Sequence, residues 1–285
     1  MDEEITDNVT AIEKLLTIMR LLRDKKHGCP WDLEQTLKSL TVYTLEEVYE
    51  VVDAIENDDM VQVEDELGDL LFQVVFYTQI ASEEGLFDFG SVADAITQKL
   101  IRRHPHVFPA GKVENFGIKS EISADQVVVK WEAIKQAERD EKIAKGGLNH
   151  LDQSSSVLND IPLALPALER AKKLQKRAAA TGFDWPELAP VLNKLKEETA
   201  ELENALTSDS QSAIHHELGD VLFSAVNLAR HCKIEPESAL RDASKRFERR
   251  FNYIEQTVRE SGNKLNELTL AQMDSLWDKA KQSGL

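Results

Sequence analysis

The chain has 285 residues, 42% of them hydrophobic and 30% charged, proportions that are typical of folded globular proteins and exclude a disordered or collagen-like chain. Only 12 Gly and 8 Pro interrupt it, and this scarcity of helix breakers favours an all-α fold of about two domains. The net charge of −17 repels a nucleic-acid backbone, so we expect no nucleic-acid partner, although divalent cations held by carboxylates can still bridge the chain to a small polyphosphate.

Neither the N-terminus nor the cysteine content indicates export. The N-terminal residues MDEEITDN lack the basic start and apolar run of a signal peptide, and the most apolar stretch, 70–81, is broken by Gln73 and Gln79. We therefore expect a cytoplasmic protein with no membrane partner. Cys29 and Cys232 have no CxxC or Cys/His spacing, so we expect two buried thiols and neither a disulfide framework nor a zinc site.

The first half predicts a helical hairpin with flanking helices. Apolar residues at i, i+3, i+4 and i+7 begin at Leu45 and again at Leu67, the spacing of amphipathic helices. The segment Asn57-Asp58-Asp59 supplies capping and turn residues between them. Together with further helices the hairpin would form a bundle, and these helices are expected at 10–23, 91–103 and 124–143.

The second half repeats this plan. A Gly- and Ser-rich stretch at 146–157 predicts a linker between an N-terminal domain, 1–145, and a C-terminal domain, 158–285. Turn residues at 207–210 again separate two helices that carry carboxylates. The flanking helices of this domain are expected at 163–180, 236–260 and 269–282.

Five carboxylates of the first half recur in the second, each displaced by the same 151 residues. The two sets are Glu46, Glu47, Glu50, Glu66 and Asp69, and Glu197, Glu198, Glu201, Glu217 and Asp220. Outside them, Arg23…Gly28…Trp31 is matched by Arg177…Gly182…Trp185. Chance does not keep so many positions in register, so we interpret the chain as two tandem helical-bundle domains that arose by internal duplication.

The repeated carboxylates predict a metal site in each half. Residues three or four apart lie side by side on a helix, so Glu47 pairs with Glu50 and Glu66 with Asp69, and an antiparallel hairpin can bring the pairs face to face. Four such carboxylates repel one another unless a hard divalent cation binds them, which favours Mg²⁺, with Mn²⁺ as a substitute. The second site would comprise Glu198, Glu201, Glu217 and Asp220.

Two other interpretations of the carboxylates are less favoured. Iron-type carboxylate bundles need Glu-x-x-His, and Asp69 and Asp220 stand where that His would be. A solvated acidic helix face would explain a lone Glu-x-x-Glu pair. Its repetition at identical spacing beside an apolar stripe favours metal binding instead.

The motifs resemble a known family. Glu-Glu-x-x-Glu, 15 residues and Glu-x-x-Asp occur twice, together with Gly28-Cys-Pro-Trp-Asp32 and Arg102-Arg-His-Pro-His-Val-Phe108, and over nearly the whole chain this pattern resembles the two-domain MazG nucleoside triphosphate pyrophosphohydrolases. The resemblance implies an all-α NTP-pyrophosphatase fold, a homodimer and Mg²⁺. It also implies hydrolysis of NTPs or dNTPs to the monophosphate and pyrophosphate by attack of water at the α-phosphorus.

Further residues are assigned candidate roles beside this metal site. Glu197 neighbours the ligands and is our candidate for orienting or deprotonating the water, with a surface glutamate as the equal alternative. Arg246 and Arg250 lie one turn apart and suit phosphate oxygens, although they would also suit pairing with Glu248 and Glu255 on a helix surface. The resemblance places phosphate-binding cations at these two arginines, the first of which is usually Lys in the family.

Other candidates concern the nucleotide. Trp277 and Lys281, at i and i+4, could present an aromatic face and an ammonium to it, unless Trp277 is a core residue. The resemblance also places Asn227 and Lys135 in the nucleotide site. We interpret four aromatic residues as structural, the tryptophans as core plugs after tight turns: His104, His106, Trp31 and Trp185.

Two functions follow, an enzyme and its alternative. The enzyme is a metal-dependent pyrophosphohydrolase; the alternative is a catalytically silent helical scaffold for dimerisation or regulation that retained its carboxylates. Complete duplicate clusters favour the enzyme. The second half has cations at successive turns from Lys245 to Arg250, whereas the corresponding helix of the first half ends at His104-Pro105, so we expect the main catalytic site in the C-terminal domain, as the resemblance also implies.

Overall fold

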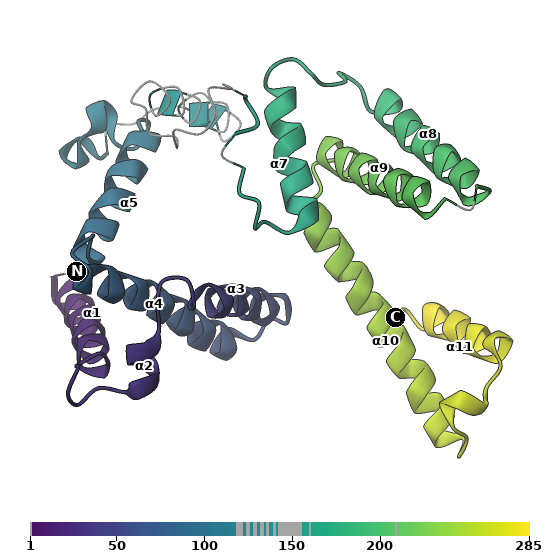
Figure 1. The fold of residues 1–285 in the computed structure, drawn as a ribbon, viewed down its shortest axis with the longest axis horizontal. Coiled ribbons are helices and arrows are strands. Elements are labelled where there is room, and N and C mark those ends of the chain that lie inside the picture. The colour runs from purple at the N-terminus through teal and green to yellow at the C-terminus, as the bar shows by residue number, and fades with distance from the viewer. Residues whose placement is uncertain are drawn as a thin grey trace. The chain divides into compact units, whose positions relative to one another are not determined.

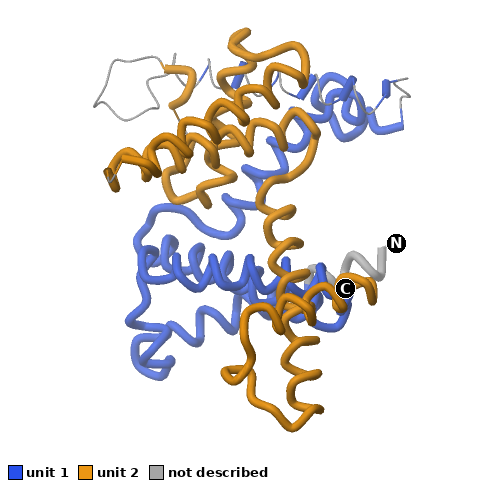
Figure 2. The backbone as a smooth tube through the Cα atoms, turned by 90° about the vertical axis from the view of Figure 1, so that its right-hand side faces the viewer, with its two compact units in different colours: residues 1–149 blue, residues 150–285 orange. Residues whose placement is uncertain are grey.

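The computed structural model describes residues 2–117, 156–159, 161–208 and 210–285, and between 117 and 156 only residues 122–123, 126–127, 130–131, 134, 137–138 and 141. The chain divides into two compact units, residues 1–149 and 150–285, which are coloured separately in Figure 2. All regular structure in the described parts is helical. The predicted all-α fold is therefore confirmed for those residues.

Unit 1 is built on a hairpin of two helices. Its described elements are α1 (Asp2–Leu22), α2 (Pro30–Glu34), α3 (Thr41–Glu56), α4 (Met60–Glu83), α5 (Phe89–Arg103) and two short 3₁₀ turns, η1 (Pro109–Gly111) and η2 (Val113–Asn115). Helices α3 and α4 lie side by side (Figure 1). The turn between them uses the residues expected of it, because Asp58 adopts φ 55° and the Asp59 side chain accepts a hydrogen bond from the backbone N–H of Gln62.

The core of unit 1 joins α1 to this hairpin. Met19 of α1, Leu40 before α3, and Val75, Phe76 and Ile80 of α4 are almost wholly buried and form one cluster. Burying a side chain of this size stabilises the fold by about 1.5–3 kcal/mol. Packing against α1 thus holds α4 in place, and with it the carboxylates of the α3–α4 hairpin.

Unit 2 repeats the hairpin and extends it. Its elements are α7 (Ala167–Ala179), α8 (Leu188–Leu206), α9 (Gln211–His231), α10 (Pro236–Glu260), η3 (Leu265–Glu267) and α11 (Leu270–Gln282). Helices α8 and α9 form the hairpin, α7 packs on α9, and α11 packs on the long helix α10 (Figure 1). The Ser210 hydroxyl caps α9 by accepting a hydrogen bond from the backbone N–H of Ala213.

Most helix predictions agree with these bounds. The helix predicted at 236–260 matches α10. The helix predicted at 163–180 corresponds to α7, which is shorter than predicted because it begins after Pro166. The helix predicted at 124–143 is described only at isolated residues, and the predicted linker 146–157 lies outside the described residues except for Ser156 and Val157. None of the described helices combines the length and the apolar content needed to cross a membrane.

Two packing predictions are wrong. Cys232 is exposed, because it follows α9 as its C-cap at the surface, and Cys29 is only partly buried. The two tryptophans are not core plugs, since Trp31 is 47% and Trp185 41% exposed. Smaller and more deeply placed side chains fill the core of unit 1, and the Trp31 ring meets one of them, Phe76, at an interplanar angle of 63°.

Candidate functional site

Three carboxylates meet between the helices of the second hairpin. Glu198 and Glu201 project from α8 and Glu217 from α9, and one oxygen of each lies within 4.8 Å of the others. Glu198 is only 6% exposed. Hydrogen bonding to Glu198, burial, and the negative charges of Glu198 and Glu217 raise the pKa of Glu201. A cation bound at this cluster would relieve that crowding.

Asp220, the fourth predicted ligand, lies beside this group. It follows Glu217 by one turn of α9, and its Oδ2 lies 3.4 Å from Nε2 of His216. Asp220 also lines a pocket together with Glu198. The hairpin therefore brings three of the four predicted ligands together and leaves the fourth at the edge of the pocket.

The first hairpin also assembles three carboxylates, two of which, Glu47 and Glu66, correspond to members of the second cluster. Oxygens of Glu47, Glu66 and Asp69 lie within 4.8 Å of one another. Burial raises the pKa of Glu47, and so do the charges of Asp69 and Glu50 and a hydrogen bond with Glu50. The charge of Glu66 raises it too, so the other three predicted ligands all act on Glu47 in this unit.

Lys194 is a site residue that the sequence reasoning missed. Its Nζ lies 2.6 Å from Oε1 of Glu197 and 2.8 Å from Oε1 of Glu198, and these two carboxylates raise the pKa of the ammonium. The i, i+3, i+4 spacing on one helix was the available signal. Glu197 itself is more than half exposed and does not contribute to the pocket wall.

A pocket of about 550 Å³ opens beside the second cluster. It lies between α7, the loop 182–185, α8 and α9, and Gly182 enables the loop by adopting φ +90°. One end carries Lys194, Glu198 and Asp220. Most of the remaining wall is apolar, with side chains that include Leu158, Leu174, Ala178, Phe183, Trp185 and Phe223.

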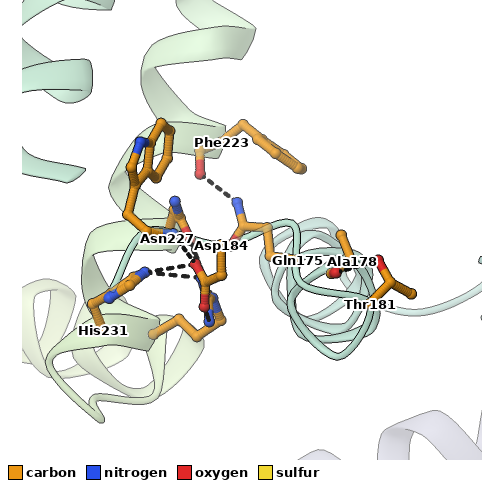
Figure 3. A network of polar contacts seen from close by, with 9 residues as sticks. Gln175, Ala178, Thr181, Asp184, Phe223, Asn227 and His231 are labelled. Atoms are coloured by element: carbon orange, nitrogen blue, oxygen red, sulfur yellow. Dashed lines mark hydrogen bonds and ion pairs between the residues drawn. The ribbon is translucent and has the colours of Figure 1, made fainter. Parts of the chain in front are cut away.

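The opposite end of the pocket is a polar network (Figure 3). Arg230 donates from Nη1 and Nη2 to the two carboxylate oxygens of Asp184, at 2.9 and 2.5 Å, and from Nε and Nη2 to Oδ1 of Asn227, at 3.1 and 2.8 Å. His231 Nε2 lies 3.0 Å from Asp184 Oδ1. Hydrogen bonds from Arg230, followed by the contact with His231, hold the pKa of Asp184 at about 2 despite its partial burial.

The other predicted nucleotide residues are divided between this pocket and α10–α11. Asn227 lines the pocket, whereas Arg246, Arg250, Trp277 and Lys281 do not. The Arg250 guanidinium lies 5.5 Å from the centre of the Trp277 ring and its Nε donates to the backbone oxygen of Leu285. Lys281 pairs with Asp278 at 3.1 Å. Lys135 lies outside the described residues.

Aromatic rings occupy the corresponding place in unit 1. Tyr43 and Phe76 stand 151 residues before Lys194 and Asn227. The Trp31 ring is steeply inclined to both rings, at 72° and 63°, with centroids 5.6 and 6.4 Å away, and Phe76 is fully buried. Where unit 2 has a pocket with polar ends, unit 1 therefore has an apolar cluster.

Comparisons with known proteins point to one family. The sequence model of the MazG nucleotide pyrophosphohydrolase domain matches residues 35–108 and 188–254, the segments that contain the two hairpins. The chain is 46% identical over 276 residues to the nucleoside triphosphate pyrophosphohydrolase of Escherichia coli K12, covering 96% of this chain and 98% of that one.

Two further relatives agree. The nucleoside triphosphate pyrophosphohydrolase/pyrophosphatase MazG of Thermotoga maritima is 40% identical over 271 residues, covering 94% of this chain and 95% of that protein. The protein YabN of Bacillus subtilis is 41% identical over 268 residues, covering 94% of this chain but 51% of the relative. Similarity to the first two relatives thus extends over nearly the full length of both partners.

Proposed function

This chain belongs to the MazG nucleotide pyrophosphohydrolase family, and from that premise we propose that it hydrolyses nucleoside triphosphates, both ribo- and deoxyribonucleotides, to the monophosphate and pyrophosphate. The observation that supports this function best is that Glu198, a member of the carboxylate cluster of unit 2, and Asp220 line a pocket of about 550 Å³. At the positions that correspond to Lys194 and Asn227, unit 1 has Tyr43 and Phe76, whose rings contact Trp31. We therefore assign the main catalytic site to the second unit, in the domain at 158–285.

The donor set fits a hard divalent cation. Glu198, Glu201 and Glu217 offer oxygen ligands only, which suits Mg²⁺ with Mn²⁺ as a substitute. Their mutual repulsion, expressed in the raised pKa of Glu201, favours a positive partner. When bound, such an ion neutralises phosphate charge and makes a nearby water more acidic. We assign Asp220, whose Oδ2 lies 3.4 Å from Nε2 of His216, as the residue that would supply the fourth ligand.

The residues around the cluster supply the rest of the reaction. Glu197 orients the attacking water and accepts its proton, and the Lys194 ammonium lies 2.6 Å from its Oε1. The water oxygen forms a bond with the α-phosphorus while the bond from that phosphorus to the bridging oxygen breaks, so pyrophosphate leaves. Lys194 also lies where its ammonium can offset charge on the departing group.

The nucleoside occupies the apolar part of the pocket, where Phe183 and Trp185 offer aromatic surface. Asn227 contacts it from α9. We assign phosphate and base contacts also to Arg246, Arg250, Trp277, Lys281 and Lys135. Because the first four lie on α10 and α11 and outside the pocket wall, we assign their contact with substrate to the homodimer that the family resemblance implies.

A direct assay tests this proposal. The protein is incubated with a panel of NTPs and dNTPs and Mg²⁺, with and without EDTA, and pyrophosphate is measured. Release that depends on the metal is expected. The aromatic cluster of unit 1 favours a catalytically silent scaffold for that unit. If no nucleotide releases pyrophosphate, the enzyme assignment is wrong, and the whole chain is such a scaffold.

A further inference from the structure

The pocket has two distinct ends on one face of α9. Asn227 follows Asp220 by seven residues, or about two helical turns, so both side chains project from the same face with about 10 Å between them along the axis. Both line the pocket. If the proposed function holds, the phosphates lie at the end with Asp220, and the nucleoside extends along the apolar wall toward Asn227.

The orientation of the Asn227 amide is set by its neighbour. A guanidinium has only donors, so the Asn227 atom that faces Arg230 at 2.8 and 3.1 Å must be the oxygen. The NH₂ group therefore points away from Arg230. Arg230 is itself held by Asp184 through two hydrogen bonds, and this clamp opposes rotation of the amide.

The side-chain oxygens of Asp184 and Gln175 at this end are engaged or inaccessible. Asp184 accepts from Arg230 with both oxygens, and its Oδ1 also accepts from the backbone N–H of Trp185 at 3.0 Å. Gln175 donates from Nε2 to the backbone oxygen of Phe223, while its Oε1 is buried and has no hydrogen-bond partner among the described residues. Apart from the Ser224 hydroxyl, which can donate or accept, the polar side chains at this end thus offer donors to a ligand.

We propose that Asn227, positioned by the Arg230–Asp184 pair, donates a hydrogen bond from its NH₂ group to the edge of the nucleobase. It thereby selects bases that carry a keto oxygen at that edge. Uracil, thymine, guanine and hypoxanthine have such an oxygen, whereas adenine and cytosine carry an amino group at the equivalent position. An amino group would oppose the Asn227 NH₂ with another donor and leave both unpaired in a partly buried wall. Asn227 touches the substrate, and Arg230 and Asp184 are positioning residues.

Two matched pairs of substrates isolate this contact. Inosine and adenosine triphosphates differ at the 6-position and the adjacent ring nitrogen, and uridine and cytidine triphosphates differ at the 4-position and the adjacent ring nitrogen. We expect kcat/KM for pyrophosphate release with Mg²⁺ to be about three- to tenfold higher for the keto member of each pair, the range that one hydrogen bond supplies. Binding of inosine and adenosine monophosphates, measured by titration calorimetry, should show the same order.

Three variants separate recognition from stability. Asn227→Asp keeps the shape and the partner of Arg230 but presents an acceptor, so the preference should reverse. Arg230→Met frees the amide to rotate, so both ratios should approach one. Arg259→Met, an exposed arginine at the end of α10, is the matched control and should keep the wild-type ratios. Thermal melting checks that each variant is folded.

The outcomes distinguish this inference from the function on which it rests. Absence of pyrophosphate release from all four nucleotides contradicts the proposed function. If pyrophosphate is released with equal efficiency from both members of each pair, recognition by the Asn227 donor is contradicted, but the proposed function is not. The same holds if folded Asn227→Asp retains the wild-type preference, because a carboxylate cannot donate to a keto oxygen at neutral pH.

Discussion

The Nζ of Lys194 lies 2.8 Å from Oε1 of Glu198, one turn further along α8. The ammonium is thus a cation already present at the carboxylates that we assign to the metal. Because like charges compete for the same ligands, Lys194 lowers the affinity of the cluster for a divalent ion while it contributes positive charge to the reaction.

Replacing Lys194 should therefore have opposite effects on metal binding and on turnover. For Lys194→Gln we expect Mn²⁺ to bind about three- to tenfold more tightly, because a competing positive charge is lost from the carboxylates, and we expect kcat to fall. Titration calorimetry and steady-state pyrophosphate release measure the two effects. Lys196→Gln, an exposed lysine two residues away, is the control. A parallel fall of metal affinity and kcat would contradict the role given to Lys194.

The two carboxylate clusters should differ in their importance for catalysis. We expect Glu47→Gln/Glu50→Gln to retain most NTP hydrolysis and Glu198→Gln/Glu201→Gln to lose most of it, because only the second cluster is joined to the open pocket. Steady-state rates across several NTPs, with circular dichroism to check folding, compare the two double variants. Equal losses, or a larger loss in the first variant, would refute the assignment of the site to unit 2.

Replacing single ligands should also abolish activity without unfolding the chain. Glu198→Gln and Asp220→Asn each remove one charged ligand, so both should lose pyrophosphate release while melting near the wild-type temperature. Relief of like-charge crowding is a further reason to expect that stability is kept. Full turnover by either variant would remove that residue from the ligand set.

The Asp184–Arg230 pair should make the stability of unit 2 depend on acid. The pKa of Asp184 is about 2 in the folded chain, below its ordinary value of 3.8. Its stabilising contribution is therefore fully present above about pH 4 and is lost as the pH falls from about 4 to 2. We expect Asp184→Asn to unfold at lower urea concentration than wild type at pH 7, and the difference to shrink below pH 4. A difference that stays constant down to pH 2 would contradict this linkage.

Cations on α10 and α11 should affect nucleotide binding more than metal binding. Arg250 and Lys281 lie on helices other than those that carry the carboxylates. We therefore expect Arg250→Ala and Lys281→Ala to retain the affinity for Mn²⁺ and to lower the affinity for a non-hydrolysable nucleotide. Titration of each ligand separates the effects. Unchanged nucleotide affinity and turnover would leave Arg250 as a residue that only packs on Trp277 and the C-terminus.

The sequence by itself determined the helices, the two hairpins and the two acidic clusters. These features are local, since the helical repeat places residues three or four apart on one face and the turn residues between Glu56 and Met60 reverse the chain. The identical spacing of the carboxylates in both halves then predicted which faces meet. Lys194 was encoded in the same way, at i+3 and i+4 from its partners.

Only the tertiary structure decided which hairpin opens into a pocket. Asp184 and Arg230 are 46 residues apart in sequence, and their meeting depends on how the loop 182–185 and α7 pack against α9. Packing likewise decided that Phe76 is buried in unit 1, and that Trp185 lines a pocket instead of filling a core. Side chains brought together from distant segments leave no periodic pattern in the chain, because their contacts depend on the relative placement of whole helices.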